Sequence, residues 1–150
     1  MNHRYLLDTN ILLRAADPAS SRHHQAVEAV ASLLETGWDC VVTAQVLIEF
    51  WVVATRPLEV NGLGWTVEHT NSEIGSVLNE FLLLEDSPAI FPLWIDYVTT
   101  HQIKGKRVHD VRLQAVMKVH QVTHLLTFNS GDFIPLEGMV IVDPSQVILR

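Results

Sequence analysis

Four acidic residues stand at positions where a carboxylate suggests chemistry. Asp8 follows the apolar run "YLL", and Glu49 interrupts the apolar stretch "VLIEFWVV". Asp110 follows "KGKRVH", and Asp132 lies in "TFNSGDF". A charge among apolar neighbours is costly to bury unless it is paired, so Glu49 in particular calls for a partner or a bound cation.

Each acid also has an ordinary structural explanation. Asp8 and Asp110 can cap the helices expected after them, and Asp132 can be a turn residue. Glu49 can form a salt bridge with Arg56 on the same helix. Four separate explanations are then needed, whereas one shared metal site accounts for all four acids. Hard divalent cations such as Mg²⁺ or Mn²⁺ take oxygen ligands and offset the repulsion between clustered carboxylates.

A zinc site is disfavoured by the cysteine and histidine pattern. The chain has one cysteine, and its eight histidines show no HExxH or HxH arrangement. Cys40 is expected to be a buried core thiol. His120 and His124 straddle the end of an expected helix, and we expect both to be solvated surface residues.

Short apolar strands alternate with longer segments of helical periodicity. This alternation predicts a three-layer α/β/α sandwich with a short, mostly parallel central sheet, formed by one domain over residues 1–150. Functional groups in such folds collect at the carboxyl ends of the strands, which is where Asp8 falls. Strands are expected at 5–7, 40–43, 124–128 and 139–143, and helices at 10–17, 21–37, 43–57, 70–82, 92–102 and 108–122, with Thr70 and Glu73 as a capping box.

The composition is that of a globular and rather apolar protein. Hydrophobic residues make up 48% and charged residues 18% of the chain, and the formal net charge is −7. The negative charge argues against a broad polycationic surface that grips duplex phosphates. The longest apolar runs are far shorter than a membrane span, and no secretory signal is evident, so a soluble cytoplasmic protein is expected.

With these motifs identified, the sequence resembles PIN-domain ribonucleases of the VapC type. The motifs "LLDTNILL", "VLIEF", "VHDVRLQAVM" and "LLTFNSGDF" occur in the family's order, and the resemblance runs from about residue 5 to residue 144. It implies an α/β/α sandwich and cleavage of RNA that depends on Mg²⁺ or Mn²⁺. It also implies frequent homodimers and, often, a toxin that is restrained by a small antitoxin.

The resemblance assigns roles to individual residues. It implies metal binding and catalysis by Asp8, Glu49, Asp110 and Asp132, with support from Asn10, Thr127 and Asn129. Two features depart from the family pattern: the stretch between the second and third acids is longer than in compact members, and residues 111–114 offer no fifth acid. The apolar helices within 57–105 are candidates for a dimer surface or an antitoxin groove.

Contacts with RNA need basic residues near the acids. The candidates are Arg14, Arg56, Lys104, Lys106 and Arg107, of which the last three form "KGKR" just before Asp110. A solvated loop is the ordinary explanation for such a charged run. His109 suits a general acid, although a structural role is favoured for it.

Two other classes of function compete with a nuclease. A phosphatase of the haloacid dehalogenase type also places an Asp after its first strand, but it requires a second Asp two residues later, where this chain has Asn10. A non-catalytic PIN-like module that binds RNA or a partner without cutting it stays open. Metal-dependent cleavage of RNA separates the enzyme from that module.

Overall fold

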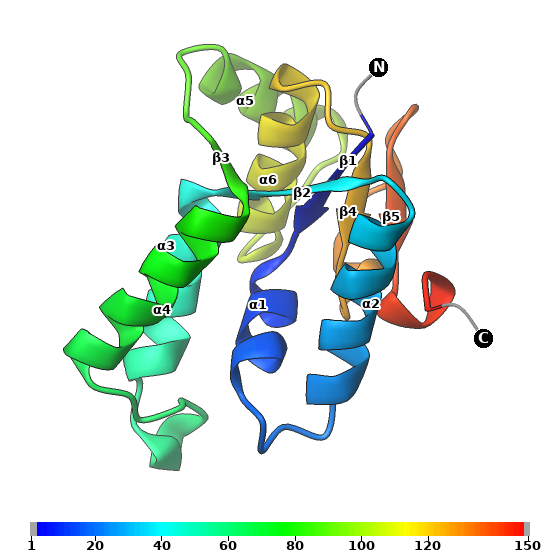
Figure 1. The fold of residues 1–150 in the computed structure, drawn as a ribbon. Coiled ribbons are helices and arrows are strands. Elements are labelled where there is room, and N and C mark those ends of the chain that lie inside the picture. The colour runs from blue at the N-terminus through cyan, green and yellow to red at the C-terminus, as the bar shows by residue number, and fades with distance from the viewer. Residues whose placement is uncertain (1–2, 149–150) are drawn as a thin grey trace.

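Within residues 3–148, five short strands form one sheet in which every neighbouring pair is parallel. The computed structural model describes residues 3–148 and is drawn in Figure 1. The strand order is β3-β2-β1-β4-β5. The strands are β1 (Arg4–Leu7), β2 (Asp39–Thr43), β3 (Leu82–Leu84), β4 (His124–Leu126) and β5 (Val140–Val142).

In the described part of the chain, six helices connect these strands and cover both faces of the sheet. Right-handed crossovers place the helices before β3 on one face and the helices between β3 and β4 on the other. Figure 1 shows α5 and α6 on the opposite side of the strands from α1 and α2, so the expected α/β/α sandwich is confirmed. The helices are α1 (Thr9–Ala16), α2 (His23–Glu35), α3 (Ala44–Thr55), α4 (Val67–Glu80), α5 (Ile90–Thr100) and α6 (Arg107–Val119).

The strand order reverses between β1 and β4. The chain moves outward from β1 through β2 to β3 and then returns to the other side of β1, where Leu7 pairs with Leu126. A crevice at the carboxyl ends of two such strands is the usual binding position in open parallel sheets. Asp8 and Thr127 follow these two strands directly, so the topology brings both side chains to this crevice.

The sheet is apolar on both faces because helices cover both. Leu6, Val41 and Leu125 are in register on adjacent strands, and all three are fully buried. A smaller cluster of Ile90 and Val116 joins α5 to α6. Within residues 3–148, no helix combines the length and the apolar character needed to cross a membrane.

The structure corrects the single helix that was expected over 70–82. Thr66, not Thr70, caps α4, because its hydroxyl accepts a hydrogen bond from the His69 N–H at 3.0 Å. Helix α4 ends at Glu80, and the following Leu82–Leu84 forms the unexpected edge strand β3 beside β2. The run "LLL" satisfies helical and strand periods equally, so the pairing with β2 decides its structure.

The predictions for single aromatic and sulfur residues have mixed outcomes. Cys40 is buried as expected, and burial raises the pKa of its thiol to about 12. His124 was wrongly expected at the surface: it is half-buried against Trp38 and Tyr5, with ring centroids at 4.7 and 5.0 Å, and burial lowers its pKa. His120 is also half-buried, with its Nε2 at 2.7 Å from the Glu85 carbonyl oxygen.

Two valines of α3 offer a matched test of the core. Val46 is 1% exposed and Val52 is 49% exposed. We expect Val46→Ala to lower the free energy of unfolding by about 2 kcal/mol, because it removes two buried carbons and leaves a cavity. Val52→Ala should change the free energy of unfolding of the monomer by less than about 0.5 kcal/mol. Urea unfolding measures both variants, and equal losses would contradict this account of the core.

Candidate active site

Asp8 is fixed at the junction of β1, α1 and β4. It is the N-cap of α1, and its Oδ1 accepts a hydrogen bond from the Thr9 N–H at 2.8 Å. Its Oδ2 accepts from the Thr127 hydroxyl at 2.8 Å and from the Asn10 side-chain amide at 3.4 Å. Its own N–H donates to the Leu126 carbonyl at 3.1 Å. The carboxylate therefore caps a helix with one oxygen and presents the other to the crevice between β1 and β4.

Asn10 and Thr127 hold each other as well as Asp8. The Asn10 amide donates to the Thr127 hydroxyl at 3.1 Å, and its carbonyl oxygen accepts from the Phe128 N–H at 3.1 Å. Thr127 is fully buried, so its hydroxyl has a defined position. Asn129 joins this network through its backbone N–H, which donates to the Thr127 hydroxyl at 3.0 Å, while its side chain is exposed.

Asp110 lies in the first turn of α6 and is half-buried. It does not cap this helix, because the N-cap position belongs to Lys106. The pKa of Asp110 is raised to about 7: burial is the largest cause, repulsion from Asp8, Asp132 and Glu49 adds to it, and nearby Arg107 acts in the opposite direction. Asp110 therefore experiences the charge of all three other candidate acids.

The pKa of Asp8 is raised for related reasons. Burial is the main cause, and repulsion from Glu49 and Asp132 adds to it. The hydrogen bonds from Thr127 and Thr9 act in the opposite direction because they stabilise the charged form. Acids from four separate segments of the chain are thus near enough to oppose one another's ionisation.

The environment of Glu49 differs from the sequence-based expectation. Glu49 is exposed, because α3 turns Val46, Leu47 and Phe50 toward the core instead. Arg56 is not its partner: the ion pairs within residues 3–148 are His24–Glu28 at 3.1 Å and Arg112–Asp86 at 3.3 Å. Asp132, in the 3-10 turn Ser130–Asp132, is exposed as well.

Two buried polar side chains that the sequence reasoning missed connect the elements that carry the acids. The Thr9 hydroxyl donates to the Val46 carbonyl at 3.1 Å and so joins α1 to α3. Fully buried Gln114 donates from Nε2 to the Ile134 carbonyl at 2.8 Å and accepts from the Ile134 N–H at 3.2 Å. This second pair joins α6 to the segment after Asp132. The sequence did contain a signal for this contact, because Gln114 places an amide within the apolar stripe of α6.

The basic candidates separate into two groups. The charge of Arg107 acts on Asp110, and exposed Lys104 and Lys106 lie just before it in the chain. Arg14 lies in the last turn of α1 and Arg56 follows the end of α3, and neither has a described interaction with the four acids in residues 3–148.

Arg22 is a further cation near the site, and the sequence analysis did not predict it. The guanidinium of Arg22 stacks over the ring of Phe128, at 4.8 Å from its centroid. Phe128 directly follows Thr127, the residue that bonds Asp8.

The four candidate acids offer the kind of ligand atoms that a hard divalent cation prefers. These atoms are carboxylate oxygens, and two of the acids have pKa values raised partly by neighbouring negative charge. In the part of the chain from residue 3 to 148, no three acidic, histidine or cysteine side chains form a ready-made chelating group. Mg²⁺ does not require one, since it commonly uses one or two carboxylates and keeps several waters.

The PIN domain family model matches residues 5–134, which span all four acids. The chain belongs to the PIN domain family. No curated protein sequence matches it. The family match confirms the expected family and agrees with the fold, whereas the roles of the individual acids are predictions.

Several solved structures share this fold. VapBC-1 from nontypeable Haemophilus influenzae has a TM-score of 0.69 at 15% identity, covering 95% of this chain and 98% of that one. VapBC2 from Rickettsia felis, bound to a promoter DNA fragment, has a TM-score of 0.66 at 17% identity, covering 93% and 98%. VapC20 from Mycobacterium tuberculosis, described as a Sarcin-Ricin loop cleaving toxin, has a TM-score of 0.61 at 13% identity, covering 81% and 86%. At these identities the likeness shows the fold.

Neutralising Asp110 should stabilise the fold more at pH 8 than at pH 5. The folded-state pKa of about 7 lies above the ordinary value of 3.8, so the stability that protonated Asp110 contributes is lost as pH rises through 7. Asp110→Asn stays neutral and avoids this loss. Urea unfolding in EDTA at both pH values measures the effect, with Asp96→Asn on exposed α5 as the charge-matched control. A gain that is equal at both pH values would contradict the repulsion inferred here.

Proposed function

We propose that this PIN domain is a metal-dependent endoribonuclease and the toxin of a toxin–antitoxin pair. The observation that carries the proposal is the position of Asp8, which the Thr127 hydroxyl holds at the carboxyl ends of β1 and β4, close enough to the other candidate acids for their charges to act on one another. A site that concentrates negative charge at the carboxyl end of a parallel sheet is suited to a divalent cation.

Asp8, Glu49, Asp110 and Asp132 would hold the ion, with Mg²⁺ as the first choice and Mn²⁺ as the second. When bound, the ion supplies a water of lowered pKa and offsets negative charge on phosphate oxygens. The Thr127 and Thr9 hydrogen bonds keep the carboxylate of Asp8 in one orientation before any ligand arrives. Ligating carboxylates must be ionised, so the high pKa of Asp110 predicts weaker ion binding below neutral pH.

RNA is the proposed substrate class. The Mycobacterium tuberculosis structure of the same fold is described as a toxin that cleaves the Sarcin-Ricin loop, an observation that supports RNA cleavage here. Arg107 beside Asp110, together with exposed Lys104 and Lys106, would contact phosphates on that side of the site. Arg14 and Arg56 are weaker candidates because they have no described link to the acids.

Cleavage of RNA should depend on Asp8 and on the ion. We expect Asp8→Asn to lower the rate by more than about 100-fold, since removal of a ligand should cost more than the 10–100-fold that loss of an outer partner typically costs. Thr127→Val, which removes the hydroxyl that bonds Asp8, should cost about 10- to 100-fold. Single-turnover assays with an RNA oligonucleotide and Mg²⁺ or Mn²⁺ measure both rates.

Asp96→Asn is the control for loss of an exposed acid on another helix, α5, and should retain the wild-type rate. Full activity of Asp8→Asn, or activity that persists in EDTA, would refute the nuclease proposal. Binding of RNA without cleavage by the wild type would support the non-catalytic module instead.

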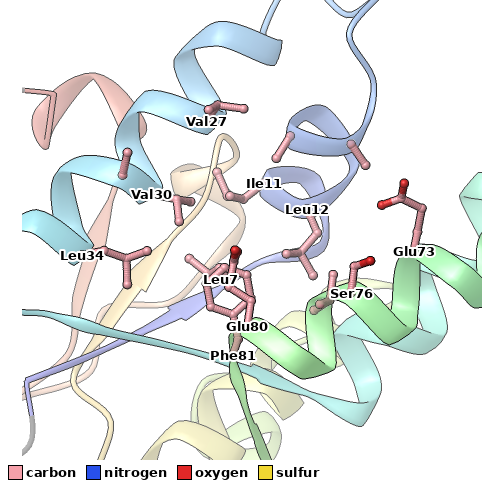
Figure 2. Close-up of a pocket in the computed structure, with 14 residues that line it drawn as sticks. Leu7, Ile11, Leu12, Val27, Val30, Leu34, Glu73, Ser76, Glu80 and Phe81 are labelled. Carbon is pink, nitrogen blue, oxygen red and sulfur yellow. The ribbon is translucent and has the colours of Figure 1, made fainter.

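This protein has an apolar groove that could receive the proposed antitoxin partner. Figure 2 shows this cavity of about 370 Å³, with Ile11 and Leu12 of α1 facing Val27 and Leu34 of α2, and with α4 on the third side. Val27 and Leu34 are 42% and 44% exposed, so their apolar side chains are open to a partner. Amphipathic segments bind grooves of this kind through apolar anchors.

The acidic rim of the groove favours a basic edge on the partner. Glu73 and Glu80 of α4 border the apolar wall, as Figure 2 shows. One of the similar solved structures, from Klebsiella pneumoniae, is named as a toxin–antitoxin complex, and its name supports a partner of this class. For the expected homodimer we propose a different surface, the apolar cavity between α3 and α4 that is bordered by Ile48, Val52 and Leu78.

A charge placed in the groove should weaken binding of the antitoxin. We expect Val27→Glu to reduce complex formation at least 10-fold, because it puts a carboxylate on an apolar contact surface. Val67→Glu is the control: Val67 is 56% exposed and lies at the start of α4, outside the groove. Co-purification and titration with the product of the adjacent open reading frame measure both variants. Equal binding by the two would exclude this groove as the interface.

A further inference from the structure

A second cleft adjoins the candidate active site. It has a volume of about 320 Å³ and is lined by Gln45, Ile48 and Glu49 of α3, Asp86 of the segment after β3, and His109 and Arg112 of α6. Glu49 lines its wall, and His109 directly precedes Asp110 in the chain. The cleft is therefore next to two of the four acids that are proposed to hold the ion.

Arg112 is the cation of this cleft, and its guanidinium is held in a defined orientation. Its Nη1 donates to the Gln45 Oε1 at 2.9 Å, and its Nη2 donates to the Asp86 Oδ1 at 3.3 Å. Gln45 is fixed in turn, because its Nε2 donates to the His109 carbonyl at 2.7 Å. A chain of three hydrogen bonds thus aligns the guanidinium between α3 and α6.

The pair of Arg112 with Asp86 is open to exchange. The Arg112 side chain is 34% exposed and that of Asp86 is 52% exposed, and ion pairs this accessible to water contribute little stability. A guanidinium has five N–H donors, and the described bonds to Gln45 and Asp86 engage two of its nitrogens. An anionic oxygen already sits at one of these nitrogens, so a ligand oxygen of the same charge can take that position.

A phosphodiester is the anion that this position suits. The planar fork of an arginine matches two oxygens of a phosphate, whereas a lysine offers only a point charge. The chain carries a net charge of −7, so an RNA strand that approaches the acids needs a local cation. Arg112 supplies one on the Glu49 side of the site, while Arg107 lies near Asp110.

We propose that Arg112 binds a phosphate of the RNA strand next to the cleavage point and that Gln45 is the residue that positions its guanidinium. This inference rests on the proposed ribonuclease function. The rival account is that Arg112 only braces α3 against α6 through Gln45 and Asp86. The two accounts differ in what they expect when Asp86 is changed.

Binding of a labelled single-stranded RNA, measured by fluorescence anisotropy between 50 and 200 mM salt with Ca²⁺ present, separates the two accounts. Arg112→Gln should weaken binding about 10-fold and reduce the slope of log K against log salt by about 0.7, as expected for one lost phosphate contact with a single strand. Asp86→Asn should bind at least as tightly as the wild type, because it frees the guanidinium and removes a negative charge. Arg112→Lys should fall between the wild type and Arg112→Gln.

Lys118→Gln is the matched control, since it removes one positive charge from an exposed position on the same helix. It should change the slope by less than half as much as Arg112→Gln. Equal weakening by Arg112→Gln and Asp86→Asn would overturn the proposal in favour of bracing, and so would equal effects of Arg112→Gln and Lys118→Gln. Thermal unfolding of each variant identifies a loss that comes from misfolding.

Cleavage assays distinguish this inference from the function on which it rests. If the wild type cleaves RNA and Arg112→Gln retains its KM and salt dependence, the phosphate contact is wrong and the ribonuclease stands. If the wild type neither binds nor cleaves RNA, the ribonuclease proposal fails and this inference fails with it. A raised KM with a nearly unchanged kcat in Arg112→Gln supports a contact that holds the strand.

Discussion

The hydrogen bond between Thr127 and Asp8 is the contact on which the site depends. It joins residues that are 119 positions apart in the chain and that follow two adjacent strands of the sheet. Parallel pairing of β1 with β4 fixes where the two backbones end, and the buried hydroxyl then fixes where the carboxylate points. The remaining acids arrive on separate elements and are placed relative to this one.

Opposing effects act on the protonation of Asp8 and Asp110. Burial and mutual repulsion favour protonation of Asp8 and Asp110, whereas the hydrogen bonds to Asp8 and the charge of Arg107 favour their ionised forms. The surrounding fold bears the cost of this arrangement through its apolar sheet and through the buried bonds made by Thr9 and Gln114. Local destabilisation of this kind is typical of sites that gain stability from a ligand.

The sequence was informative where structure depends on local pattern. Short apolar runs predict the strands, and their alternation with helical segments predicts the sandwich. The same runs place Asp8 at the carboxyl end of a strand. The strand Leu82–Leu84 was missed because a uniform run carries no period, and its pairing with β2 is a contact between segments far apart in the chain. The exposure of Glu49 and the bond of Arg112 to Gln45 depend on how α3 lies against its neighbours, which no window of sequence contains.

The buried amide of Gln114 has a consequence for how such a protein can change. Its two bonds to the Ile134 backbone tie the helix of Asp110 to the segment that follows Asp132, from a position that water does not reach. An inherited substitution at position 114 would shift two acids relative to each other while leaving every acid in the sequence intact. Under the proposed function, such a descendant could become an inactive copy that sequence comparison of its acidic motifs would still count as an enzyme.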